Sequence, residues 1–273
     1  MIASRFWVLG TGAWDASDTT HWAASSGGAG GQSVPGSGDT VTFDGSSGGG
    51  TVTVNTTVNV TAIGMGAFTG TLDFATNDNN VTLQTFSGTG IGARTLNMGD
   101  GTWTITGGSW NNITATNFTL NANGSTLNFT STAAARITFT GNASLTYNNI
   151  TVGAAGANGY DFLFNLATTV AGTLTITGPR LVTFAGATTT IAAINCTGSS
   201  SSPVAFSSST VNSPATISVA SGSPAFSWTT FRDITCSGGA TFAATNSLDL
   251  GRNSGITITP PSVGGGGGYV IGS

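Results

Sequence analysis

The stretch Leu174-Thr175-Ile176-Thr177-Gly178 alternates apolar side chains with threonine and ends on a glycine. The same pattern recurs at Trp103–Gly107 and at Ile137–Gly141. Alternation with a period of two predicts a strand with one buried face, and the glycine predicts a turn directly after it. Similar alternations fill the chain from Thr51 to about residue 259. We therefore expect an all-β protein made of short strands, each about three to six residues long.

The amino-acid composition supports this prediction. Glycine supplies 42 of the 273 residues, threonine is more frequent still, and neither lysine nor glutamate occurs. Lysine and glutamate favour helices, whereas β-branched threonine favours the extended backbone. Only 6% of the residues are charged, the net charge is −4, and no basic cluster is present, so we expect no nucleic-acid partner. The apolar runs are far too short to span a membrane, so we expect no membrane partner either.

Weak internal repetition predicts a solenoid. The phrase Ile-x-Cys-x-Gly occurs at Ile194–Gly198 and again at Ile234–Gly238. Two copies about 40 residues apart fit a period of roughly 20–25 residues per turn, which is typical of stacked coils of short strands. About ten such turns, spaced by ~4.8 Å, make a rod of ~50 Å. We predict a parallel β-helix with an N-terminal capping segment and a glycine-hinged C-terminal tail.

The repeat also gives an expectation for the two cysteines, Cys196 and Cys236. They hold the same place in the two phrases, which puts them two turns apart in one column. A separation of ~10 Å is too long for a disulfide bond. We therefore predict free thiols that face the interior of the rod.

The sequence divides into three segments. Residues 1–50 hold three tryptophans and two glycine-rich loops, and we expect this segment to cap or attach the rod. Residues 51–261 form the β-helix, which ends at Pro260-Pro261 because proline cannot donate to a strand ladder. Residues 262–273 are a glycine-rich hinge with an apolar arm, for which the alternative is a frayed terminus. The expected interaction anchors are Phe6, Trp7, Trp14 and Trp22 in the first segment and Tyr269, Val270 and Ile271 in the arm.

No group of catalytic residues is apparent in the sequence. The ten acidic residues are all aspartates, and most stand beside Gly, Asn, Ser or Thr, as turn-forming aspartates do. Glycoside cleavage needs two carboxylates that face each other across a sugar, and no local spacing indicates such a pair. Asn77–Asn80 and Asp100-Gly101 predict ordinary turns rather than calcium loops. The only histidine, His21, lacks a nucleophile pattern and is expected to be structural, so we expect no enzyme, cofactor or metal site.

The tryptophans of the repeat region fall into two groups. Trp103 and Trp228 lie within apolar alternations, so we expect them in the core or at corners. Trp110 lies between Gly107-Gly108-Ser109 and Asn111-Asn112, and we expect its ring to be exposed. An exposed aromatic ring is the kind of surface on which a sugar stacks.

Two parts of the chain resemble a known group of proteins. They are the opening Phe6–Asp15, continued by His21-Trp22, Ser33–Pro35 and Asp39–Asp44, and the closing stretches Phe231–Ala240 and Asn246–Gly255. The opening resembles an N-terminal pattern of phage virion proteins and bacterial surface β-solenoids, and the closing stretches resemble their last turns. The two parts cover about a third of the chain. The resemblance implies a right-handed parallel β-helix, often trimeric, on the outside of a virion.

Within this group we expect a non-enzymatic homotrimeric capsid decoration or cement protein on the outer surface of a phage particle. Its partners would be the major capsid protein or other virion proteins. The bacterial members carry secretion signals or membrane anchors, and Met1–Leu9 shows no basic region followed by a long apolar stretch, which favours a phage. The alternative is a tail fibre or tailspike that binds host surface polysaccharide through exposed aromatic rings and paired aspartates. A bacterial adhesin is a third class, distinguished by a secretion or anchoring element.

Overall fold

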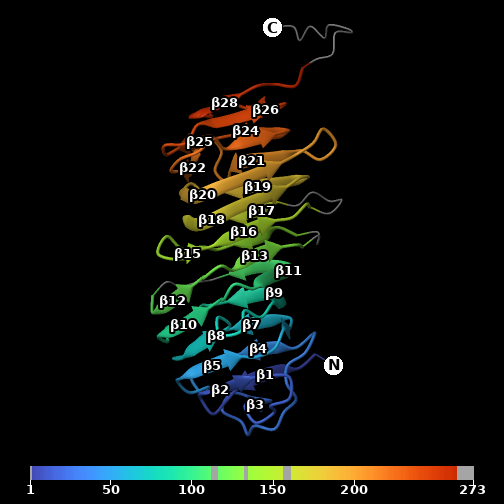
Figure 1. Ribbon diagram of the computed structural model, residues 1–273, viewed down its shortest axis with the longest axis vertical. Helices are drawn as coiled ribbons and strands as arrows, with labels where there is room; N and C mark the ends of the chain where they lie inside the picture. Colours follow the sequence, from blue (N-terminus) through green and yellow to red (C-terminus); the bar gives the residue numbers. More distant parts are fainter. Residues whose placement is uncertain (1, 112–115, 132–134, 156–160, 263–273) are drawn as a thin grey trace.

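The protein is a rod of stacked coils, with the N-terminal strands at one end and the last strands at the other (Figure 1). The computed structural model describes residues 2–111, 116–131, 135–155 and 161–262. Within these ranges the chain contains 28 strands and no helix. None of the described residues therefore forms a helix that is long and apolar enough to cross a membrane. Almost all of the strand pairings are parallel, which confirms the predicted all-β parallel β-helix.

Each full coil passes through three faces, which we call face 1, face 2 and face 3. Face 1 contains β2 (Gly12–Trp14), β5 (Thr51–Val54), β8 (Thr71–Asp73), β10 (Arg94–Asn97), β12 (Phe118–Asn121), β15 (Thr146–Tyr147), the first parts of β18 (Thr168–Thr177) and β20 (Thr188–Thr197), β22 (Ala215–Val219) and β25 (Ile234–Ser237).

Face 2 contains β6 (Val58–Asn59), the first parts of β9 (Val81–Ser87) and β11 (Thr102–Asn111), β13 (Thr126–Phe129), β16 (Asn149–Val152), the second parts of β18 and β20, β23 (Ala225–Ser227), β26 (Phe242–Thr245) and β28 (Ile256–Ile258). Face 3 contains β1 (Ser4–Trp7), β4 (Thr40–Thr42), β7 (Ala62–Gly64), the second parts of β9 and β11, β14 (Ile137–Phe139), β17 (Phe162–Phe164), β19 (Arg180–Phe184), β21 (Val204–Ser208), β24 (Thr229–Arg232) and β27 (Leu248–Asp249). The short β3 (Trp22–Ala23) is antiparallel to β1.

The register between coils confirms the predicted repeat length. In face 2, Trp103 pairs with Val81 in the coil below and with Leu127 in the coil above, at sequence separations of 22 and 24 residues. Face 2 contains ten described strands, which is the number of turns expected from the sequence. Because the coils are parallel and in register, most strands pair with the strands above and below them, and inward side chains form continuous columns.

Four strands are longer than expected, because each continues around a corner from one face to the next. β9 has seven residues, and β11, β18 and β20 have ten each. The register shifts at these corners, between Ile105 and Ser109 in β11 and between Val170 and Thr173 in β18. The prediction of at most about six residues was wrong here, since a bulge lets a strand bend without ending.

The sequence phrases do not mark equivalent points of the coil. Trp103 and Leu174 both lie in face 2, whereas Ile137 begins a strand of face 3. Likewise, Cys196 pairs with Phe226 in face 2, but Cys236 pairs with Ile217 in face 1. The prediction that the two cysteines share a column was therefore wrong, because the insertions at the corners vary in length.

The prediction of free, inward thiols is confirmed. Cys196 and Cys236 are both unpaired and buried. Burial raises the pKa of each thiol to about 12. Because the thiolate is the reactive form, these cysteines are inert packing residues at neutral pH.

The core is one continuous column of aliphatic and aromatic side chains along the rod. Trp103 is fully buried, and its ring lies 4.6 Å from that of Phe74 and 6.0 Å from that of Trp110. The expectation that Trp110 is exposed was wrong: its exposed fraction is 0%, and its ring stacks on Phe86 at 4.3 Å. The glycines before Trp110 form the corner, after which the chain enters face 3 with the tryptophan side chain inward.

The first coil closes one end of this column. Trp22 packs edge to face against both Trp7 and Trp14, and all three rings also contact Phe43. The indole N–H of Trp7 donates to the carbonyl of Gly10 at 2.7 Å. Besides this packing, β1, β2 and β4 of residues 1–50 pair with the strands of the following coils.

We expect Trp103→Ala to lower the free energy of unfolding by about 3–5 kcal/mol, since it leaves a large cavity in a fully packed column. The exposed Ile91 is the matched control, and Ile91→Ala should change that free energy by no more than about 0.5 kcal/mol. Urea denaturation followed by far-UV circular dichroism measures both. Equal effects of the two substitutions would contradict the assignment of Trp103 to the core.

Candidate functional site

The exterior carries few large apolar side chains, and several of them gather on one face. Eight such side chains are exposed among the described residues, and Leu181, Leu248 and Leu250 all lie on or beside face 3 near the C-terminal end. The exterior of the rod is otherwise rich in threonine, serine and asparagine. A cluster of exposed apolar side chains on such a surface indicates a binding region.

Two outward columns of face 3 form this region. One column is Leu181, Ala205, Thr230 and Leu248, which are paired in register from β19 to β27. The other is Leu163, Thr183, Ser207 and Arg232, paired from β17 to β24. Because small side chains occupy the middle of both columns and longer ones stand at their ends, the surface between them is concave. We call this surface the lateral groove.

Two adjoining hollows lie along the lateral groove. The larger has a volume of about 400 Å³, and its lining includes Leu181, Thr183, Ser207 and Leu250. The smaller has a volume of about 220 Å³ and is lined by Pro179, Arg180, Leu181, Pro203, Val204, Ala205 and Thr230. Leu181, Ala205 and Thr230 line both, so the two hollows are parts of one surface.

An ion pair stands at one end of the groove. Nε of Arg136 donates to Oδ1 of Asp161 at 2.8 Å, and the hydroxyl of Thr183 donates to Oδ2 of the same carboxylate at 3.0 Å. Arg136 remains more than half exposed. Asp161 is buried, so the guanidinium of Arg136 is the charge that a partner meets at this end.

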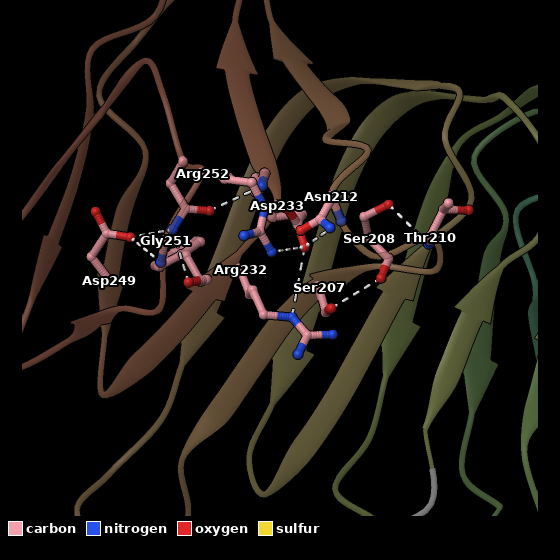
Figure 2. A network of polar contacts seen from close by, with 12 residues as sticks. Ser207, Ser208, Thr210, Asn212, Arg232, Asp233, Asp249, Gly251 and Arg252 are labelled. Carbon is pink, nitrogen blue, oxygen red and sulfur yellow. Dashed lines mark hydrogen bonds and ion pairs between the residues drawn. The ribbon is translucent and has the colours of Figure 1, made fainter.

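At the other end a buried aspartate joins the last coils. Figure 2 shows Arg232 and Arg252 converging on Asp233, whose side chain is fully buried. Nε of Arg252 donates to Oδ1 of Asp233, and Nη2 donates to Oδ2 at 3.0 Å. Nε of Arg232 lies 3.7 Å from Oδ2. The backbone N–H of Asn212, in the preceding coil, also reaches Oδ2, at 3.4 Å.

This arrangement has a clear electrostatic consequence. The hydrogen bonds from Arg252 hold the pKa of Asp233 below its ordinary value against the opposing effect of desolvation, and the Asn212 N–H adds to the lowering. Asp233 in turn raises the pKa of Arg252. Asp233 also has a positive φ of 57°, which its place at the corner between β24 and β25 imposes. We call Asp233, Arg252 and Arg232 the C-terminal clamp.

A separate hollow lies on face 1, where the hydrogen-bonded pairing of successive strands is interrupted. β12 is the last strand of one sheet, and the described strands show no pairing between it and β15 of the next coil. The hollow, of about 600 Å³, includes Asn97, Asn121, Asn123 and Asn148 in its lining. Nδ2 of Asn121 donates to Oδ1 of Asn97 at 2.8 Å. We call this hollow the asparagine cleft; amide groups both donate and accept hydrogen bonds, so it suits a polar, uncharged ligand.

The predicted anchors Phe6, Trp7, Trp14 and Trp22 lie at the N-terminal end of the rod, away from the lateral groove and the asparagine cleft (Figure 1). Trp7, Trp14 and Trp22 are buried within their own chain, so their rings offer no surface to a partner, whereas Phe6 is half-buried. The predicted arm residues Tyr269, Val270 and Ile271 lie outside the described residues.

The polar residues considered from the sequence have structural contacts. Nδ1 of His21 lies 2.7 Å from Oδ2 of Asp18, and its ring stacks on Trp7 at 4.6 Å. Asp78 and Asp100 occupy turns, and each accepts a backbone N–H from the coil above, at 2.7 Å. Among the described residues, no group of three histidine, cysteine or acidic side chains could hold a metal ion.

Sequence reasoning missed the lateral groove. Leu181, Leu248 and Leu250 lie far apart along the chain, and each taken alone looks like a core residue. The sequence Arg180-Leu181-Val182 was a usable signal. In a strand, neighbouring side chains point to opposite faces, so if Val182 is buried, Leu181 must point outward. In the structure Arg180 is buried and Leu181 is exposed.

The fold and its surfaces define an all-β protein with a single parallel β-helix, a lateral apolar groove and a polar cleft. Comparisons with protein-family models, with curated proteins and with solved structures find no match. The function of this chain is therefore inferred from its own surfaces and polar contacts.

We expect Asp233→Asn to lower the midpoint of thermal unfolding by on the order of 5–10 °C, because the buried carboxylate accepts hydrogen bonds on both oxygens and an amide can accept on only one. Asp78→Asn is the matched control, since the side-chain oxygen that accepts a backbone N–H is retained and no arginine pairs with Asp78 in the described part of the chain. Calorimetry of both variants measures the effect. If Asp78→Asn lowers the unfolding midpoint as far as Asp233→Asn does, the C-terminal clamp contributes no more to stability than an ordinary turn aspartate.

The same pair predicts a pH dependence with a definite sign. The folded-state pKa of Asp233 lies below the unfolded value, so its contribution is complete above that ordinary value, about 3.9, and is lost as the pH falls through the folded-state pKa. The difference in unfolding midpoint between wild type and Asp233→Asn should be constant from about pH 5 to 8 and shrink below about pH 4. A difference that grows in acid would contradict the lowered pKa.

Proposed function

We propose that this chain is a non-enzymatic structural protein on the outer surface of a phage virion. In this proposal it is a homotrimeric capsid decoration or cement protein whose partners are the major capsid protein or other virion proteins. The observation that carries the proposal is the lateral groove on a stiff rod. A surface that joins apolar side chains to internally paired charges suits contact with another protein.

Two properties of the rod support a mechanical role. Coil-to-coil hydrogen bonding runs through ten strands of face 2, so the rod resists bending and stretching. Its exterior carries little charge, so its contacts should depend only weakly on salt. In this proposal the rod acts as a rigid element that ties neighbouring subunits of a shell together.

The described carboxylates support a structural rather than a catalytic assignment. Asp78 and Asp100 each accept a backbone N–H of the next coil, and Asp233 is engaged by Arg252. A general acid or base needs a carboxyl group that can reach a substrate proton. These three groups are instead committed to holding coils together.

A second candidate function, a tail fibre or tailspike that binds host surface polysaccharide, is favoured by the asparagine cleft. Nδ2 of Asn97 donates to Oδ1 of Asp73 and its Oδ1 accepts from Nδ2 of Asn121, so both amides are held in place, and Oδ1 of Asn121 can accept from a sugar hydroxyl group. The cleft volume of about 600 Å³ is in the range of small-molecule sites.

We expect density for this rod on the shell of imaged phage particles. Particles that lack the protein should release their genome at a lower temperature, because the rods that tie neighbouring shell subunits together are missing. Thermal release followed with a DNA-binding dye measures this, with readdition of the purified protein as the control. Density on the tail, together with binding on a glycan array that Asn121→Ala abolishes, would replace this proposal with the second one.

A further inference from the structure

One surface residue, Trp228, has a backbone conformation that does not suit it. Its φ is +50°, and its side chain is half-buried at the corner between β23 and β24. Ser227 pairs with Thr197 below and with Thr245 above, so Gly198, Trp228 and Asn246 occupy the same corner in successive coils. Glycine and asparagine tolerate positive φ, whereas a bulky side chain there is strained.

The coil below approaches the backbone of this corner closely. A Cβ atom added to Gly198 would lie 2.7 Å from the carbonyl oxygen of Trp228, 2.8 Å from that of Ser227 and 3.2 Å from the Trp228 Cβ. Any residue other than glycine at position 228 would have these same atoms, so Gly198 fits the path of the backbone and not the indole ring. The tryptophan itself is the exception at this corner, since asparagine would be less strained there, and such local inconsistency is expected at functional positions.

Trp228 continues the lateral groove toward the corner. The N–H of Val204 donates to the carbonyl of Trp228 at 3.0 Å, and the N–H of Arg180 donates to that of Pro203 at 3.2 Å. Pro179, Pro203 and Trp228 therefore stack in successive coils, and both prolines are exposed. This third column runs beside the groove column that starts at Leu181, so one apolar surface extends along the rod.

We propose that Trp228, with Pro179 and Pro203 and the adjoining lateral groove, is the surface on which a second copy of this chain packs. The inference rests on the proposed homotrimer and assigns its contact surface. Trp228 is the principal contact residue, because tryptophan is enriched among binding hot spots.

The charges around the groove favour a second copy as the partner. Four arginines, Arg136, Arg180, Arg232 and Arg252, and three aspartates, Asp161, Asp233 and Asp249, line or border the groove, so its formal charge is +1. Such a surface suits a partner that carries few charges and is acidic rather than basic. This chain, with 6% charged residues and a net charge of −4, meets both conditions.

The direction of the surface also fits a parallel neighbour. All three columns run along the rod from coil to coil, so a copy that lies alongside covers them together. A partner that meets only one end of the rod would leave most of this surface exposed.

The test is Trp228→Asn in the full chain, which replaces the tryptophan by the residue that the next coil uses at the same corner. Sedimentation equilibrium and native mass spectrometry should show a trimer for the wild type and at least a tenfold weaker association for the variant. Thermal unfolding, measured at concentrations where both proteins are monomeric, should show a midpoint equal to or above that of the wild type, because the strain is relieved. Ile91→Asn, an exposed apolar residue outside the surface, should leave association unchanged.

The outcomes separate this inference from the proposed function. A variant that assembles as tightly as the wild type, or one whose monomer is less stable, overturns the role of Trp228 while the virion assignment stands. A wild type that stays monomeric at every concentration overturns the second copy as partner. The location of the rod in imaged particles tests the virion assignment independently of either result.

Discussion

The backbone hydrogen bond between successive coils is the interaction on which the rest of the structure depends. No single strand here has more than ten residues, and a short isolated strand cannot stay ordered in water. Stacking in parallel and in register gives the main-chain groups of each coil partners above and below. The same stacking brings inward side chains into contact, so hydrogen bonding and apolar burial reinforce each other at every coil. Trp103, between Val81 and Leu127, takes part in both.

Because hydrogen bonding between coils and the inward side chains hold the rod together, most outward side chains are not needed for the fold. Outward threonine stabilises the extended backbone without needing a partner, and turn residues such as Asp78 and Asp100 accept N–H groups from the next coil. Outward residues that are neither threonine-like nor turn-forming are therefore informative. Leu181 and Leu248 place apolar surface in water, and Trp228 holds a positive φ. All three lie on or beside one groove, which is why we assign binding to that surface.

The two ends of the rod are stabilised by different chemistry. At the N-terminal end Trp7, Trp14 and Trp22 fill the interior of the first coil, and the antiparallel β3 closes it. Near the C-terminal end Asp233 joins coils through the side chain of Arg252 and the backbone of Asn212. The tryptophan rings are uncharged, although the Asp18–His21 pair lies against Trp7. The C-terminal end depends directly on the charge of the buried Asp233.

The sequence by itself determined the fold class, because strand alternation, β-branched residues and the absence of lysine and glutamate are local properties of the chain. It also determined the length of the coil and the burial of both cysteines, since these follow from period and polarity. Tertiary structure alone decided which residues share a column. Corner insertions of unequal length put Cys196 and Cys236 on different faces and turned Trp110 inward. Tertiary structure alone also brought Pro203, Trp228 and Leu181 together, because residues in neighbouring coils are far apart in sequence and their pairing depends on the register of every coil between them.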